Sequence, residues 1–363
     1  MTALSKEKLH RFHIALLVFN TQCGVALFIL PRLTAIHLGT NGWLGVPVGY
    51  LAVTLNIMLI TLVYRLGRGA SIFRILGDGL PRFLLVPLYL VLAVTLPMIG
   101  CMVIKEYVVI YQILMFPQTS EVVLKLFVDL VVFLMVTKGI YNMSKANLFF
   151  VAILLSMVPA GLTLISNFDF VRLTPFIFKE GKDVGQGIFR MYAAFLGYEL
   201  FIFLFPYAEN NKKWLKYLHL GNALTGSVYL LVTVLCYGFF NYNELTDLAF
   251  PLLDMFGYLK FPFIERVQNF LYSAFLLSIV TTASMYYWAS QTVVAEIFPR
   301  LPGKGVVFTL MAGSILVALI PKTLPEVEKW FAMLLYFESG VAFGLPLLAL
   351  LSLLIQKGRK SHA

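Results

Sequence analysis

The sequence predicts an all-α integral membrane protein with about ten transmembrane helices, forming a single domain over residues 1–363. Two observations carry this prediction. Hydrophobic residues make up 60% of the chain, charged residues only 13%, and the mean hydropathy is +0.86. Soluble domains are nearer half apolar and a quarter charged. The apolar runs are about 20 residues long without period-two alternation, which favours helices over a barrel.

Ten apolar segments follow one another along the chain. We expect the first to be retained as a span, because it is too long for a signal peptide and no cleavage site follows it. The third and eighth exceed one bilayer crossing, so we expect them to tilt or project. The segments are 12–36, 43–64, 83–111, 122–136, 146–165, 188–207, 217–240, 263–295, 306–320 and 330–355. The links 166–187 and 241–262 have room for short surface helices.

The basic residues predict an orientation. Of 28 lysines and arginines, 17 fall in the tails and links on the side of the N-terminus, whereas the links on the other side balance to zero net charge. Basic links stay in the cytoplasm, so we expect both termini there, which requires an even number of spans. This topology explains the net charge of +10 without a nucleic-acid partner.

The first span contains polar and helix-breaking residues near its middle. Thr21 and Gln22 precede Gly24 and Ala26, and Pro31 follows. Glycine lowers helix stability, and proline removes an amide and clashes with the preceding turn. In lipid an unpaired backbone group costs several kcal/mol, so an opened turn must face protein or a cavity. We therefore expect a break over 21–26. The competing interpretation is close helix packing and interhelical hydrogen bonding.

The sixth span repeats this pattern. The run Leu196, Gly197, Tyr198 and Glu199 lies near its middle, and Pro206 stands near its end. A carboxylate at mid-membrane costs on the order of 3 kcal/mol or more. We therefore expect Glu199 to contact ligand, accept a proton or pair with a base. The alternative is a protonated structural carboxyl bonded to an opened carbonyl.

Two interrupted helices at matching positions indicate an inverted repeat, with one five-helix half at about 12–165 and the other at about 188–355. Such folds bind ligands at the interface between the repeats. The N-termini of half-helices offer N–H groups to an anion, and their C-termini offer carbonyls to a cation. An α-amino acid carries both charges, so the pattern favours an amino-acid site.

Other polar residues are weaker candidates. Thr282 of the eighth span and Cys101 of the third should border the same cavity, although packing explains both as well. Asp129 has Lys125 one turn away, which predicts a local ion pair. Glu338 has no base nearby in sequence, so its role stays open. Lys105 and Glu106 are expected to be interfacial charges. No nucleophile–base pair, metal cluster or phosphate loop is visible, so we expect neither an enzyme nor a cofactor.

The run from Gly24 to Arg32 resembles the first-helix motif of the amino acid–polyamine–organocation superfamily. Its Leu-Pro-Arg ending, together with Gly197-Tyr198-Glu199, resembles the B subunits of GerA-type spore-germinant receptors. The resemblance covers essentially the whole chain. It implies a LeuT-type fold, residence in the inner membrane of a bacterial spore, and association with A-type and lipoprotein C-type subunits. One departure is Ala26, which stands where the superfamily usually has a second glycine and should narrow the site.

The function that the resemblance implies is sensing of a small germinant, commonly an amino acid. The runner-up is an amino-acid symporter coupled to protons or sodium. A third reading is a structural or ion-conducting subunit with a vestigial site. The substrate-contacting residues we expect are Thr21, Gln22, Gly24, Ala26, Cys101, Leu196, Gly197, Tyr198, Glu199 and Thr282.

Overall fold

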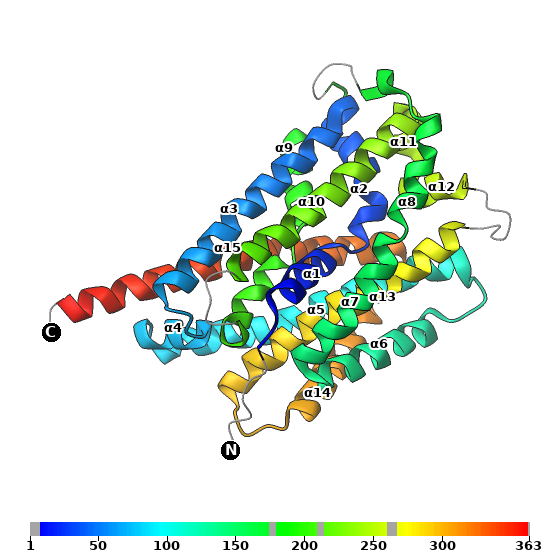
Figure 1. Cartoon of the computed structure of the whole chain (residues 1–363). Helices are drawn as coiled ribbons and strands as arrows, with labels where there is room; N and C mark the ends of the chain where they lie inside the picture. Colours follow the sequence, from blue (N-terminus) through cyan, green and yellow to red (C-terminus); the bar gives the residue numbers. More distant parts are fainter. Residues whose placement is uncertain (1–7, 174–178, 209–213, 260–266, 362–363) are drawn as a thin grey trace.

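The computed structural model describes residues 8–173, 179–208, 214–259 and 267–361, and their regular structure is helical apart from one isolated bridge (Figure 1). The long helices are α1 Arg11–Gln22, α2 Ala26–Leu38, α3 Gly45–Leu66, α5 Arg82–Met115, α6 Glu121–Thr137, α7 Gly139–Leu155, α9 Val184–Ala193, α10 Trp214–Phe239, α13 Val267–Ile297, α14 Gly303–Ala318 and α15 Leu324–Ser361. The shorter ones are η1 Gly39–Leu44, α4 Ile72–Gly79, α8 Val158–Leu162, η2 Thr163–Asn167, η3 Phe170–Leu173, η4 Tyr198–Tyr207, α11 Tyr242–Asp247 and α12 Pro251–Gly257.

Within the described residues, seven helical segments are long and apolar enough to cross a bilayer, so the chain is a multi-pass membrane protein. All ten expected segments fall on helices. The first lies on α1 and α2, the fourth on α6 and the ninth on α14. With 12, 17 and 16 residues, α1, α6 and α14 fall below that measure, whereas α2 is counted in one candidate span with α3. The count of ten spans therefore stays a prediction. Residues 263–266 of the eighth expected segment lie outside the described part of the chain.

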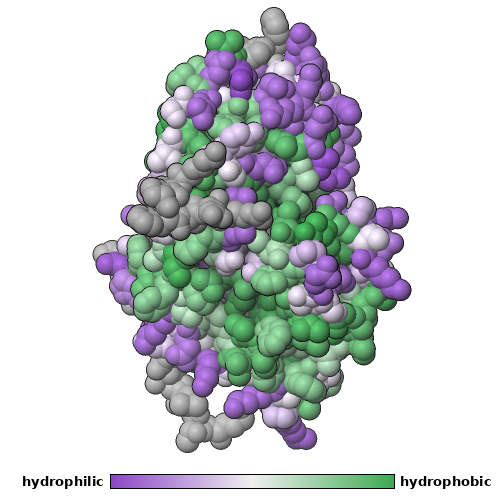
Figure 2. Space-filling view, turned by 90° about the vertical axis from the view of Figure 1, so that its right-hand side faces the viewer, coloured by the Kyte–Doolittle hydropathy of each residue, from purple (hydrophilic) through white to green (hydrophobic). Residues whose placement is uncertain are grey.

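Large apolar side chains cover much of the outer surface. Phe83, Phe127 and Phe149 are 65–74% exposed, which is costly in water and favourable in lipid. Figure 2 shows hydrophobic surface across the middle of the face in view, with hydrophilic residues gathered at its upper end. This distribution fits a protein embedded in a bilayer.

Two of the candidate spans form the interior of the bundle. The segments Val184–Tyr207 and Val267–Ile297 have 78% of their most apolar window buried, whereas the other five have between 22% and 44%. The second of these, α13, packs along α5 and also contacts α1, α6 and α7. The interrupted sixth segment therefore lies beside the best-protected helix of the fold.

The two expected breaks are present. The first helix ends at Gln22 and α2 begins at Ala26, which leaves Cys23, Gly24 and Val25 outside both. In the sixth segment α9 ends at Ala193, and the chain resumes at Tyr198 as a ten-residue 3-10 helix. The prolines do not make these openings. Pro31 lies inside α2 and Pro206 inside η4, each several residues after the opening.

Gly197 has the backbone conformation that explains the second break. Its φ is +109°, in the region that side-chain-bearing residues rarely adopt. A Cβ added there would lie 2.9 Å from Thr21 Cγ2 and 3.1 Å from the Thr21 carbonyl oxygen. The two breaks therefore touch, and Gly197 is what allows the contact. The expected surface helices are also present, as η3, α11 and α12.

We expect Gly197→Ala to destabilise the protein by about 2 kcal/mol or more, because it adds backbone strain and a clash at the same site. The measurement is thermal unfolding of the purified chain in detergent. Gly313→Ala is the control, since a Cβ there meets nothing within 4 Å in the middle of α14. Equal melting temperatures for the two variants would contradict the role given to Gly197.

Candidate ligand site at the broken helices

A cavity of about 300 Å³ lies against the two breaks and extends toward the start of α15. Its walls come from α1, α2, α5, α9, α13 and α15, together with the loop residues around Phe250. Six of the ten residues expected to contact substrate line it: Thr21, Gln22, Gly24, Ala26, Leu196 and Thr282. The sequence pattern thus predicted residues of the first, sixth and eighth segments that line one cavity.

The other four expected residues lie behind the cavity wall. Cys101 is fully buried beside Tyr287, so it does not line the cavity. Gly197 packs on Thr21, and the Tyr198 hydroxyl lies 3.0 Å from that of Tyr192. Glu199 lines a separate cavity of about 10 Å³. Direct contact with a ligand in the large cavity is therefore not expected for these four.

Gly24 leaves the first break open to the cavity. A Cβ added there would meet no atom within 4 Å, although Gly24 lines the cavity wall. The next residue, Val25, is the N-cap of α2, which has no side-chain cap. Among the described residues, nothing accepts the Val25 backbone N–H. A helix N-terminus left uncapped at a cavity is suited to bind an anionic group.

Gln22 is held by hydrogen bonds on both sides of its amide. Its Nε2 donates to the Phe195 carbonyl at 2.7 Å and to Asn222 Oδ1 at 3.1 Å. Its Oε1 accepts from Thr225 at 2.8 Å. This arrangement supports the interhelical alternative for Gln22, because the amide links the opened sixth segment to α10 and has little bonding capacity left for a ligand.

Tyr229 of α10 lies within hydrogen-bonding distance of a backbone carbonyl from each break, and its hydroxyl can donate to either one. Its hydroxyl lies 2.7 Å from the Gln22 carbonyl oxygen and 3.0 Å from that of Ala194. Sequence reasoning missed this residue, because a tyrosine within an apolar span looks like ordinary packing. The signal that was present is the need for a donor: each opened helix leaves carbonyls that lipid cannot satisfy.

The carbonyls at the end of α1 are satisfied by α13. Ser278 Oγ donates to the Cys23 carbonyl at 2.5 Å, and it also lies 2.7 Å from Asn20 Oδ1. Thr282 Oγ1 lies 3.2 Å from the Asn20 carbonyl oxygen and 3.3 Å from that of Thr21. Thr282 therefore supports the break from the cavity wall. The expectation that the eighth segment borders the site agrees with this placement.

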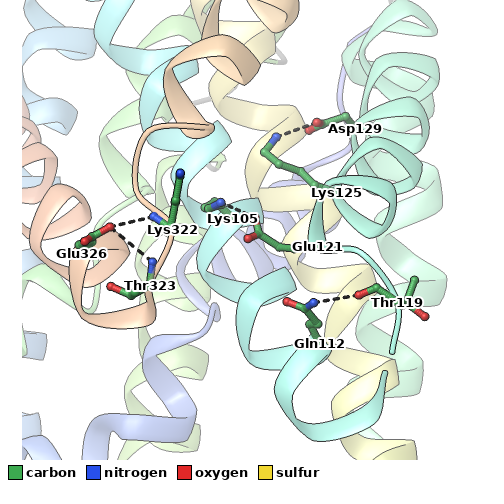
Figure 3. Close-up of polar contacts among 9 residues, drawn as sticks. All are labelled: Lys105, Gln112, Thr119, Glu121, Lys125, Asp129, Lys322, Thr323 and Glu326. Atoms are coloured by element: carbon green, nitrogen blue, oxygen red, sulfur yellow. Dashed lines mark hydrogen bonds and ion pairs between the residues drawn. The ribbon is translucent and has the colours of Figure 1, made fainter. Parts of the chain in front are cut away.

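The charges on α5 differ from the sequence-based expectation. Lys105 and Glu106 were expected to be interfacial, but they are only 3% and 5% exposed. Lys105 is paired with Glu121 of α6 (Figure 3), and neither residue lines the large cavity. Glu106 lines the cavity, and it has no hydrogen-bond or ion-pair partner among the described residues. A buried carboxylate without a partner is costly, so Glu106 is a candidate site residue whose placement sequence reasoning misjudged.

The local pair expected on α6 is confirmed. Lys125 Nζ lies 2.6 Å from Asp129 Oδ2, with both side chains buried (Figure 3). The wall of the large cavity also carries Arg32, Arg190 and Glu328. Both arginines interact electrostatically with the Glu328 carboxylate. The cavity wall therefore carries two arginines and two glutamates, and Glu106 interacts electrostatically with Glu328.

Comparison with known proteins agrees with these observations. The family described as "Spore germination protein" matches residues 8–327. Spore germination protein GerQB of Bacillus cereus is 24% identical over 292 residues, covering 78% of this chain and 79% of the relative. Spore germination protein A2 of Bacillus subtilis (strain 168) is 24% identical over 291 residues, with the same coverage. Spore germination protein B2 of the same strain is 21% identical and covers 92% of each chain.

Solved structures resemble the fold. Mhp1, a nucleobase-cation-symport-1 family transporter in a closed conformation, superposes with a TM-score of 0.63 at 12% identity, covering 91% of this chain and 75% of Mhp1. A Na⁺-coupled sialic acid symporter gives 0.60 at 12% identity, covering 95% and 79%. These likenesses show a LeuT-type transporter fold. The matched families are germination and transporter families rather than enzyme families.

Removing the Tyr229 hydroxyl tests the support of the two breaks. We expect Tyr229→Phe to lower stability by about 1–3 kcal/mol, because a buried carbonyl loses its donor. Tyr258→Phe serves as control, since Tyr258 is 58% exposed. Thermal unfolding in detergent measures both. A Tyr229→Phe variant as stable as the control would show that the carbonyls have another donor.

Proposed function

The chain belongs to the spore germination protein family, and on this premise we propose that it is the nutrient-sensing membrane subunit of a spore germination receptor. It binds a small molecule, an amino acid by preference, in the cavity at the broken helices. Binding shifts a pre-existing conformational equilibrium, because the ligand contacts elements that move relative to one another in this fold. The shift then passes to the partner subunits.

One observation carries the amino-acid assignment. The same cavity wall holds the uncapped start of α2 and the unpaired Glu106 carboxylate. An amino acid offers a carboxylate for the helix start and an ammonium group for Glu106. The volume of about 300 Å³ lies at the small end of ligand pockets, which favours a compact ligand. Ala26 supports the same choice, because its methyl group adds bulk at the break.

The location and partners are proposed from the family resemblance and the charge pattern. We place the chain in the inner membrane of the spore, with ten spans in two inverted repeats. The basic excess on the side of the termini supports cytoplasmic tails. The partners are an A-type subunit and a lipoprotein C-type subunit. An adjacent pair of genes for such subunits would support this assembly.

A second candidate function is amino-acid symport coupled to a cation. The similarity in fold to two solved transporters favours it. Proteoliposomes separate the alternatives, since a symporter accumulates labelled amino acid under a proton or sodium gradient. A receptor subunit binds the ligand without accumulating it. Gradient-driven uptake would therefore overturn the receptor assignment.

Enlarging Gly24 should abolish sensing without unfolding the protein. Gly24→Val places its side chain into the open cavity, where it meets no protein atom within 4 Å at Cβ. We expect spores carrying this variant to lose germination in a panel of amino acids, sugars and nucleosides. Gly77→Val on α4 is the control, because its Cβ is equally free but lies away from the cavity. Normal germination with Gly24→Val, at unchanged protein level, would contradict the site.

Neutralising Glu106 tests the ammonium contact separately. We expect Glu106→Gln to weaken binding of the responding amino acid about 10- to 100-fold, the range of a hydrogen bond between charged groups. Binding of the analogue without the amino group should stay within about 2-fold. Glu326→Gln is the control, since Glu326 accepts the Lys322 backbone N–H at 2.8 Å outside the cavity (Figure 3). Equal losses for the two ligands would exclude a specific ammonium contact.

A further inference from the structure

Two carboxyl groups meet in the interior beneath the ligand cavity. Glu199 lies at the start of η4 and is 5% exposed, and Glu338 lies within α15 and is 1% exposed. The two side chains interact electrostatically and line the same small cavity. No lysine, arginine or histidine among the described residues forms an ion pair with either. The pair is therefore two acids without a neutralising base.

The hydrogen bonds around the pair leave one oxygen of each carboxyl unsatisfied. Glu199 Oε2 accepts the Gly197 backbone N–H at 2.8 Å, and Glu338 Oε1 accepts the Tyr286 hydroxyl. No donor among the described residues reaches Glu199 Oε1 or Glu338 Oε2. Two ionised carboxylates are acceptors only, so they would repel at contact in a medium of low dielectric. A single proton between them converts this repulsion into a hydrogen bond.

We propose that Glu199 and Glu338 form a proton-binding site in which one shared proton links η4 to α15. The proton is the ligand of this site, and its loss leaves two like charges facing each other between the opened sixth segment and the last helix. With the proton bound, the site favours contact between η4 and α15. Without the proton, it favours their separation. This device does not depend on the germinant or on the identity of the partner subunits.

Residues next to the pair also line two larger cavities. A cavity of about 10 Å³ is lined by both carboxyls and by Phe203, and it has room for about one water molecule. Phe203 also lines a cavity of about 750 Å³ beside Thr137 and Trp288. On the other side, Tyr286 lines the ligand cavity. The pair thus lies between two larger cavities.

The groups that face the pair do not exchange protons at neutral pH, so the two carboxyls are the groups of this site that titrate. Tyr192 of α9, Tyr198 of η4 and Tyr286 of α13 interact electrostatically with one or both acids. From α5 the neighbours are Leu96 and Ile99, which carry no charge. Tyrosine hydroxyls ordinarily ionise near pH ~10. At neutral pH only the two carboxyls can exchange a proton.

Infrared difference spectroscopy of the purified full chain counts this proton directly. The wild type is compared at pH 7 with the double variant Glu199→Gln/Glu338→Gln. One shared proton predicts the loss of one protonated-carboxyl band together with one carboxylate band. The loss of two carboxylate bands, or of two protonated bands, would overturn the proposal. Asp129→Asn is the control and should lose a carboxylate band only, because Asp129 is paired with Lys125.

A second measurement tests the link between the two elements. In Glu199→Gln the amide supplies a permanent donor to Glu338, which replaces the proton without changing the shape of the side chain. Raising the pH above neutral should lower the melting temperature of the wild type, since the proton is lost, and should lower that of Glu199→Gln much less. Parallel profiles would count against the proposal. So would a wild-type melting temperature that rises when sodium replaces choline, because that result indicates a sodium ion between two carboxylates.

Discussion

The structure depends on one constraint, which is that a helix opened inside a bilayer must find new partners for its backbone. Water satisfies such groups in a soluble protein, but lipid cannot. Here side chains from α10 and α13 take that role. Tyr229 reaches carbonyls from both breaks, and Ser278 reaches the carbonyl of Cys23. Polar side chains therefore gather beside both breaks, and the cavity lies against the same two openings.

The same constraint explains how much the sequence could predict. Glycine and polar residues in the middle of an apolar run are detectable locally, so both breaks and the residues beside them were predictable. The exact bounds were less so, since the second opening already begins after Ala193. Partners contributed by distant helices leave no local pattern. A buried tyrosine such as Tyr229 and a paired lysine such as Lys105 are visible only once the helices are packed.

Glu106 shows most clearly what the local sequence could not predict. In the sequence it stands next to Lys105 near the end of a long apolar run, and adjacent opposite charges suggest an interfacial pair. Consecutive residues on a helix point in different directions, so the two charges separate. Lys105 turns to α6 and Glu106 turns to the cavity. The role of Glu338 could not be predicted for a related reason. Its acidic neighbour Glu199 lies 139 positions earlier in the chain.

Tyr229 has a consequence for motion. A hydroxyl group carries a single hydrogen, yet two carbonyl oxygens, from Gln22 and Ala194, lie within its reach. Only one of them can receive that hydrogen at a given instant. The exchange requires no more than rotation about the bond between the ring and the oxygen, so it is fast compared with movement of a helix. The first and sixth segments thus compete for one donor, and a small displacement of either segment decides which of them keeps it.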